Sequence, residues 1–551
     1  MFLGRIISNS YFNSSTLPFA SLHSFLTKPR FSFYNLTHQI RYISPYPRFN
    51  LDNLSHQIRY FSAYPRFDFG SIREPNDAAA LFREMVRTQP LPYASVFSKL
   101  LSTVVKMKQY SLALHLIDEM LQRHVPVNHY TLSIAIDCYC RQNRPDCGFA
   151  ILGIFVKRGF QPTVVTFNTL LKGLLSIERI PEAAKLLGKL SAYQLCEPDE
   201  YTYSTIIHGL CKAGDLLQAI DLLCSLEKGK GSCKPNVYAY NIVIDGLCKD
   251  GKVNEALQLF FTLGDRGISP DVVTYNSIIE GLCKMRRVDE AQDIFQLAVN
   301  SGIKPDIISY SSLMNGYCKI GRVDEVSRLF TKIGTEGLER NVVCYGTMLE
   351  ALFREGRCED GLNLFKEMEA LGLSPDVKTY NILLDGLCSA HRITEAFSIL
   401  HTMEGKGIVP DIVTFNILIE GLCNDNKVRE AKDLFDKLPS KGLQPHVITY
   451  TILIGALCEE GQIEEAKDLM MQMVSNGCLP NSVTYNVFVR GLLKMNKMLD
   501  AMPLLEEMDS RGFTLDKTAY SMLIEHVKME GRDSVLVDQV KKFLPKDFYS
   551  S

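Results

Sequence analysis

The chain lacks the sequence features that most directly identify membrane proteins, zinc proteins and enzymes. No stretch contains the roughly 18 to 20 uninterrupted apolar residues that a transmembrane helix requires, so we expect no membrane insertion. No Cys-x-x-Cys pair occurs among the 16 cysteines, and no His-x-Glu occurs anywhere. Zinc sites and zinc-dependent deaminases need such spacings, so we predict no metal, no cofactor and no catalytic activity.

Acidic residues are absent from residues 1–51, where Arg, Ser, Phe and Tyr are frequent. That composition is typical of an organelle transit peptide, and we predict a disordered mitochondrial transit peptide over residues 1–61. Residues 35–49 return in similar form as residues 53–67, and each copy holds an Arg three places before a Ser. Cleavage is expected before Ser62, or in the upstream copy before Ser44. A tail without an address and a chloroplast address stay as alternatives.

A unit of about 35 residues recurs twelve times over residues 94–516. Prolines mark the period in the middle of the run at Pro235, Pro270, Pro305, Pro375, Pro410, Pro445 and Pro480. A fixed period of this length indicates stacked repeats and not one globular core. We therefore predict a linker and half repeat over residues 62–93, twelve repeats over 94–516, and a partial capping repeat over 517–551.

Each unit reads as two helices. Residues 274–284 carry apolar side chains at helical spacing, a Gly or Asn usually follows, and a second helix then shows a small Ala at one shared position. Eight cysteines fall at one place near the end of the first helix, where we expect them to fill a small apolar slot. The fold class predicted is all-α, an α-solenoid superhelix of helix-turn-helix repeats whose first helices line the concave face.

The repeat pattern reads Val-x-Thr-Tyr-Asn-x-Leu-Ile-x-Gly-Leu-Cys-Lys, followed by Glu-Ala and then by Gly-x-x-Pro-Asp. It resembles the P-type pentatricopeptide repeat. The resemblance covers the twelve units of residues 94–516. The segment Pro90-Leu91-Pro92, with Phe97 and the residues after it, further resembles the restorer-of-fertility-like branch of plant mitochondrial proteins. In this family each repeat binds one base of single-stranded RNA.

The resemblance assigns recognition chiefly to the fifth residue of the first helix and the last residue of the unit, which we call the recognition pair. The second residue wedges between bases, and its occupants here are mostly apolar: Tyr130, Val165, Tyr201, Tyr238, Val273, Ile308, Val343, Val413, Ile448 and Val483. Ser95 and Lys378 depart from that pattern. A short polar side chain on a rigid helix can bond a base edge, so recognition pairs are expected on the concave surface.

The recognition pairs carry over unit by unit. Four resemble adenine readers: Ser98 with Asn128, Ser204 with Asn236, Ser311 with Asn341, and Thr451 with Asn481. Five resemble uracil readers: Asn168 with Asp199, Asn241 with Asp271, Asn276 with Asp306, Asn381 with Asp411, and Asn486 with Asp516. Gly346 with Asp376 leans to guanine, while Ser133 with Thr163 and Asn416 with His446 match no base.

Helix capping is the competing explanation for these pairs, because Asn, Ser, Thr and Asp are also ordinary cap residues. The two positions covary within the chain, however. Ser or Thr at the fifth position goes mostly with a final Asn, and Asn goes mostly with a final Asp. Capping alone gives no reason for that pairing, so we favour base recognition.

The net charge does not favour nucleic acid. Subtracting the net +5 of residues 1–61 from the −2 of the whole chain leaves −7 for the rest, whereas nucleic-acid binders are usually basic. Local basic residues follow the repeated cysteine position, where they either reach phosphates or complement the helix dipole: Lys212, Lys249, Lys284, Lys319, Arg354 and Lys494.

A protein-binding tetratricopeptide scaffold is the alternative from another class. That repeat has about 34 residues and an early Trp, whereas this chain has no Trp. We predict a single-stranded RNA-binding adaptor in the mitochondrial matrix, acting in RNA processing, stabilisation or translation, with a separate nuclease or processing factor as a further partner.

Overall fold

The computed structural model describes residues 67–193, 195–228 and 233–530. The predicted transit peptide and its two cleavage positions lie outside these residues. Every regular element in the described part is helical, which confirms the predicted fold class. None of the described helices combines the length and the apolar character needed to span a membrane.

The chain divides into two compact units. The first holds α3 (Pro75–Arg87), α4 (Ala94–Lys106), α5 (Tyr110–Gln122), α6 (His129–Arg141), α7 (Pro145–Lys157), α8 (Val164–Ser176), α9 (Ile180–Ala192), α10 (Glu200–Lys212), α11 (Leu216–Lys228), α12 (Val237–Lys249), α13 (Val253–Asp265) and α14 (Val272–Lys284). Helix α15 (Val288–Asn300) is divided between the units.

The second unit holds α16 (Ile307–Lys319), α17 (Val323–Thr335), α18 (Val342–Arg354), α19 (Cys358–Ala370), α20 (Val377–Ser389), α21 (Ile393–Gly405), α22 (Ile412–Asn424), α23 (Val428–Asp436), α24 (Val447–Glu459), α25 (Ile463–Ser475), α26 (Ser482–Lys494), α27 (Met498–Ser510) and α28 (Lys517–Glu530). The short 3-10 helix η3 (Pro439–Lys441) follows α23.

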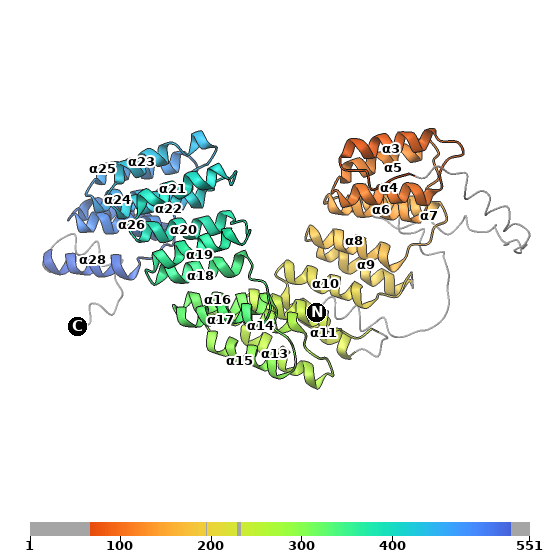
Figure 1. Cartoon of the computed structure of the whole chain (residues 1–551), viewed down its shortest axis with the longest axis horizontal. Coiled ribbons are helices and arrows are strands. Elements are labelled where there is room, and N and C mark those ends of the chain that lie inside the picture. The colour runs from red at the N-terminus through yellow and green to blue at the C-terminus, as the bar shows by residue number, and fades with distance from the viewer. Residues whose placement is uncertain (1–66, 194, 229–232, 531–551) are drawn as a thin grey trace, which may run out of the picture. The chain divides into compact units, whose positions relative to one another are not determined.

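Within each unit the helices form antiparallel pairs that stack in sequence order (Figure 1). We call the even-numbered helices A helices and the odd-numbered ones B helices. Each A helix packs closely along the next A helix of its unit, whereas the described B helices make few contacts with one another, the most being between α3 and α5. The A helices are the more closely packed set, as expected for the inner helices of a stacked helical repeat.

A left-handed residue closes the turn between the helices of a repeat. Glycine takes this role at Gly214 and Gly251, with φ of 83° and 77°. Arg286 departs from the Gly or Asn pattern in sequence, yet its φ of 59° is also left-handed. The stacked architecture therefore imposes the conformation even where the side chain disfavours it.

The repeated cysteines fill small slots between successive A helices, as the period predicts. A Cβ added to Gly173 would lie 2.5 Å from Cys140 Sγ, and one added to Gly421 would lie 2.6 Å from Cys388 Sγ. Both thiols are buried, and burial raises the pKa of each to about 12. Each of these cysteines thus acts as a neutral packing residue against a glycine of the next A helix.

Aromatic pairs join several B helices to the following A helix. The rings of Phe260 and Tyr275 meet edge to face with centroids 5.2 Å apart, and Phe435 and Tyr450 repeat this contact at 5.2 Å. Edge-to-face pairs at this distance stabilise a core beyond the area that they bury. Consecutive repeats are thereby held in one register.

Candidate nucleic-acid interface

A row of exposed apolar side chains runs along the A helices. The second-position residues are between 48% and 67% exposed, although each is Val, Ile or Tyr: Tyr130, Val165, Tyr201, Tyr238, Val273, Ile308, Val343, Val413, Ile448 and Val483. Ser95 and Lys378 at the same position are exposed as well. Exposed apolar residues at one repeated position do not build a core, so this row is a surface available for flat apolar partners.

The fifth-position side chains lie beneath this row. Most are almost buried, with Asn168 only 5% and Asn276 only 8% exposed. The close packing of successive A helices explains this burial, since a short side chain at their seam is covered from both sides.

The last residue of most repeats caps the next A helix. Asp271 Oδ1 accepts the backbone N–H of Thr274 at 2.9 Å, and the Thr274 hydroxyl accepts the backbone N–H of Asp271 at 3.1 Å. Side-chain caps of this kind are made by Asn128, Asp199, Asn236, Asp271, Asp306, Asn341, Asp376, Asp411 and Asn481. Thr163 and His446 cap through the reciprocal pair alone. The capping explanation is thus correct for these residues.

Four recognition pairs are also joined directly by their side chains. Asn241 Nδ2 donates to Asp271 Oδ1 at 2.9 Å. The equivalent bonds are 3.3 Å for Asn168 to Asp199 and 3.3 Å for Asn381 to Asp411, and Ser98 Oγ donates to Asn128 Oδ1 at 3.1 Å. An amide donor matches a carboxylate acceptor, so this bond is a structural reason for the covariation that capping alone does not supply. Covariation by itself therefore does not prove base recognition.

Other predicted pairs are not joined in this way. Ser133, Ser311 and Thr451 donate their hydroxyls to backbone carbonyls of their own helices, and Asn236 donates to Glu200 and not to Ser204. Gly346 has no side chain to offer Asp376.

Two buried amide oxygens have no hydrogen-bond partner, namely Asn168 Oδ1 and Asn416 Oδ1. Buried polar atoms without partners are rare and costly. Both belong to fifth-position residues, and the repeat that holds Asn416 ends in His446. A hydrogen-bonding ligand that reached this row would satisfy them.

The capping aspartates are held in the ionised form. Burial raises the pKa of Asp271, but hydrogen bonds from the Thr274 backbone, the Asn241 amide and the Thr274 hydroxyl outweigh it, and the net pKa is lowered. Asp199, Asp376 and Asp411 follow the same pattern. The amide of the fifth residue is therefore presented beside a fixed negative charge.

The basic residues at the end of the A helices fall into two groups. Lys249, Lys284 and Arg354 form ion pairs with the carboxylate one turn earlier, at 2.6, 2.7 and 2.7 Å. In the described part of the chain no such pair forms for Lys212, Lys319 or Lys494, because His208, Asn315 and Arg490 occupy the earlier position. Among the described residues, the second group thus has no carboxylate partner one turn earlier.

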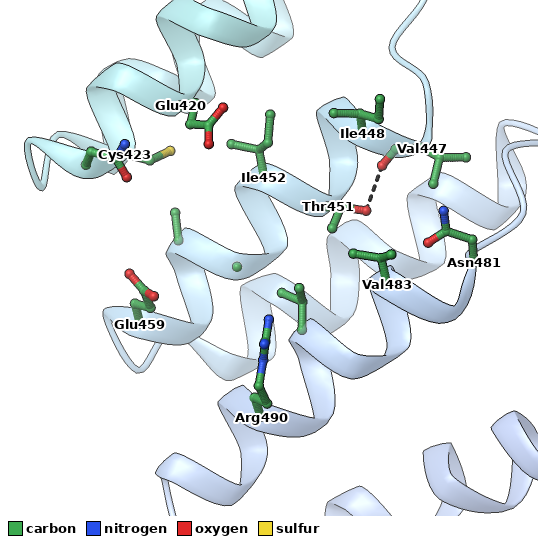
Figure 2. A pocket seen from close by; sticks show the side chains of 14 residues that line it. Glu420, Cys423, Val447, Ile448, Thr451, Ile452, Glu459, Asn481, Val483 and Arg490 are labelled. Carbon is green, nitrogen blue, oxygen red and sulfur yellow. Dashed lines mark hydrogen bonds between the residues drawn. The ribbon is translucent and has the colours of Figure 1, made fainter. Parts of the chain in front are cut away.

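Hollows on the A-helix surface lie between second-position residues of neighbouring repeats. One in the first unit is lined by Lys172, Tyr201, Ser204, Lys212 and Tyr238 among others. Figure 2 shows one in the second unit, where Thr451 lies between Ile448 and Val483 with Asn481 at the start of α26. A fifth-position hydroxyl flanked by two exposed side chains has the arrangement expected for holding one flat base.

Acidic side chains mark part of this surface in the second unit. Asp385 and Glu420 occupy the same position in successive repeats. Burial raises the pKa of both, and the negative charge of another carboxylate adds a smaller increase. Ser389 and Asn424 replace the basic residue one turn later. These repeats offer phosphates less attraction than those around Lys212.

Sequence reasoning missed one component, the third residue of the A helices. The Thr274 hydroxyl donates to Asn241 Oδ1 at 2.6 Å, and the Thr414 hydroxyl donates to Asn381 Oδ1 at 2.7 Å. The available signal was the Thr that recurs at the third position of most A helices. The sequence did not reveal its role, because its hydrogen-bond partner lies 33 residues earlier in the chain.

Fold and interface together define a helical-repeat protein of the α-solenoid class. Ten overlapping segments match the model of the PPR repeat family: residues 162–212, 198–249, 235–284, 270–319, 305–349, 340–389, 381–424, 410–459, 445–494 and 480–527. These matches cover more than half of the chain. The chain belongs to the PPR (pentatricopeptide) repeat family.

Similar proteins include two mitochondrial pentatricopeptide repeat-containing proteins of Arabidopsis thaliana, the first of them described as putative. The first is 38% identical over 114 residues, which are 21% of this chain and 19% of that protein. The second is 41% identical over 87 residues, 16% of this chain and 14% of that protein. Less than a fifth of each relative is matched, so these similarities concern repeats and not whole proteins.

The crystal structure of the pentatricopeptide repeat protein PPR10 from maize has a similar fold. It matches with a TM-score of 0.58 and 22% identity, over 87% of this chain and 66% of that one. At this identity the likeness establishes the α-solenoid alone.

Proposed function

We propose that this protein is a sequence-specific adaptor for single-stranded RNA, with one base per repeat. The observation that carries the proposal is the row of exposed Val, Ile and Tyr side chains above a row of polar fifth-position residues. Apolar side chains at fixed spacing can pack on base faces, while the polar residues between them bond base edges. Family membership supports the same conclusion.

The RNA sequence follows from the recognition pairs. With the N-terminal repeat at the 5′ end, as the family resemblance implies, the twelve repeats select a strand approximating A-N-U-A-U-U-A-(G/N)-U-Y-A-U. The second, eighth and tenth positions are the least determined, because Ser133 with Thr163, Gly346 with Asp376, and Asn416 with His446 are unusual pairs.

We place this activity in mitochondria. The acid-poor residues 1–61 support that location, as do the mitochondrial names of the similar Arabidopsis proteins. The segment Pro90-Leu91-Pro92 suggests the restorer-of-fertility-like branch. Bound to one transcript site, the protein blocks an exonuclease, remodels local RNA structure or guides a separate nuclease.

The decisive experiment exchanges one recognition pair. Asn241→Ser with Asp271→Asn converts the fifth repeat from the uracil pattern to the adenine pattern and retains a capping residue at position 271. Affinity is measured by fluorescence anisotropy for the predicted twelve-nucleotide RNA and for its variant with A at the fifth position. The preference should reverse by roughly tenfold or more, since direct base contacts contribute about 1 to 3 kcal/mol.

Asp271→Asn alone serves as the control for the cap, and thermal unfolding checks that each variant is folded. If the folded double variant keeps its preference for U, the pair is a structural cap. The protein-binding scaffold would then be the better account of the exposed row.

A further inference from the structure

Two recognition pairs of identical composition adopt different conformations. In the fifth repeat Asn241 Nδ2 donates to Asp271 Oδ1 at 2.9 Å. In the twelfth repeat Asn486 makes no such bond to Asp516. Its Oδ1 accepts the backbone N–H of Asp516 at 2.8 Å, and its Nδ2 donates to the carbonyls of Ser482 at 2.8 Å and Thr514 at 3.1 Å. The side chain has turned to the backbone.

The residue three places after the cap accounts for the difference. Thr274 follows Asp271, and its hydroxyl donates to Asn241 Oδ1 at 2.6 Å. Thr414 does the same to Asn381 Oδ1 at 2.7 Å, and Asn381 likewise donates to its aspartate. Ala519 stands at this place after Asp516 and has no hydroxyl.

The hydroxyl stabilises the orientation in which the donor end of the amide meets the carboxylate. An Asn side chain has one acceptor end and one donor end, and a carboxylate accepts only from the donor end. In the fifth and ninth repeats a hydroxyl on the acceptor end completes this arrangement at both ends of the amide. Asn168 keeps its bond to Asp199 without such a hydroxyl, but its Oδ1 is then left without a partner. Asn486 also has no hydroxyl on its acceptor end, and its Oδ1 accepts the backbone N–H of Asp516 instead.

A competing ion pair does not explain the change. Arg490 Nη1 contacts Asp516 Oδ2 at 3.2 Å, whereas Asp516 Oδ1 caps the backbone N–H of Ala519 at 2.7 Å. Oδ1 is the oxygen that Asp271 and Asp411 offer to Asn241 and Asn381. It is present in the twelfth repeat in the same capping role.

We propose that Thr274 and Thr414 are positioning residues for base recognition. We also propose that the twelfth repeat does not discriminate uracil, which replaces the U that its pair Asn486 and Asp516 assigned to the twelfth position. The proposal rests on the proposed RNA-binding function. Specificity at one repeat is then set by three residues, and the third belongs to the A helix of the next repeat.

The test measures base preference with the full chain and four RNAs that differ only at the fifth nucleotide, and four that differ only at the twelfth. Thr274→Val retains the side-chain shape and removes the hydroxyl. It should lower the preference for U at the fifth nucleotide by roughly three- to tenfold, the size of one net hydrogen bond. Ala519→Thr should create a preference for U at the twelfth nucleotide, where the natural protein has none.

Thr202→Val is the matched control. Thr202 makes the same reciprocal cap with Asp199, at 3.1 and 2.8 Å, and its hydroxyl donates to Asp199 Oδ1 at 2.7 Å, but it makes no bond to Asn168. It should destabilise the protein as much as Thr274→Val while changing the preference at the third nucleotide less. Thermal unfolding of all three variants separates the two effects.

A wild-type preference for U at the twelfth nucleotide, or unchanged preferences in folded Thr274→Val and Ala519→Thr, overturns the positioning role and leaves RNA recognition intact. Absence of any base preference along the whole RNA overturns the proposed function itself and this inference with it.

Discussion

Cys248 and Gly281, on successive A helices α12 and α14, approach each other so closely that a Cβ on Gly281 would lie 2.5 Å from Cys248 Sγ and 2.7 Å from its Cβ. Real Cβ atoms do not show such contacts. The buried thiol occupies the space that the missing side chain leaves, and the same pairing recurs along the stack. The distance between A helices is therefore set by a sulfur atom against a bare backbone.

Gly281→Ala should destabilise the protein by about 1 to 3 kcal/mol, because the added methyl group overpacks this seam. Gly264→Ala, in helix α13, is the matched control, because a Cβ there meets nothing within 4 Å. Alanine is the better helix former by up to about 1 kcal/mol, so this control should stabilise. Urea unfolding followed by circular dichroism measures both, and equal midpoints for the two variants would contradict the packing role.

Glu178→Gly should stabilise the first unit. Glu178 closes its turn with φ of 61°, the left-handed conformation that glycine adopts readily. Relief of about 1 to 2 kcal/mol of strain exceeds the entropic cost of a new glycine, about 0.5 to 1 kcal/mol. The urea midpoint should rise for Glu178→Gly and fall for Gly214→Ala, whose φ is 83°. A lower midpoint for Glu178→Gly would mean that its side chain makes a compensating contact.

Acid should weaken the fold through the capping aspartates. The pKa values of Asp199, Asp271 and Asp411 are lowered in the folded protein. Such groups contribute stability above their unfolded pKa of about 3.9, and the contribution is lost as the pH falls through the folded value. The free energy of unfolding should thus vary little from about pH 7 to pH 5 on their account and fall below about pH 4.

The triple variant Asp199→Asn, Asp271→Asn and Asp411→Asn tests the assignment, because Asn caps a helix but does not titrate. Its unfolding midpoint should depend less steeply on pH below about 4 than that of the natural protein. Parallel curves for the two proteins would assign the acid sensitivity to other carboxylates.

RNA affinity should depend only weakly on salt. The residues after position 61 carry net −7, and several basic residues of the A helices are already paired. A single strand held by six to ten phosphates gives a log–log slope of about −4 to −7, at ~0.7 per contact, and we expect a shallower slope.

Lys212→Ala should flatten that slope by about 0.7, whereas Lys249→Ala should change it less because Asp245 holds Lys249 at 2.6 Å. The slope is obtained from anisotropy titrations at several salt concentrations. A slope as steep as that of a phosphate clamp would show that backbone contacts, and not bases, supply most of the affinity.

The period predicted the helix pairs and the cysteine slot, because each depends on a local pattern repeated at a fixed interval. The second-position row came from the family resemblance, and Tyr201 and Val273 are exposed in the structure. The left-handed Arg286 was not predictable from its own preference, since the neighbouring repeats impose the turn.

The burial of Asn168 and the turned side chain of Asn486 could not be predicted from the sequence, for a different reason. Both depend on how two A helices approach and on which atoms of the next repeat are within reach. Thr274 carries a hydroxyl that Ala519 lacks. That one polar atom affects which hydrogen-bond partner is available to the amide side chain one repeat earlier.

The dual use of the last residue limits how such a protein can change its target over evolutionary time. Asp271 ends one recognition pair and begins helix α14, so a mutation that altered the chosen base would also alter the start of a helix. Asn and Asp are both good helix caps, so an exchange between them should change the free energy of unfolding little. A residue that caps a helix poorly would lower the stability of the fold at this position, whatever base it favoured. Fewer residue types are therefore available at the last position of a repeat than base recognition alone would allow.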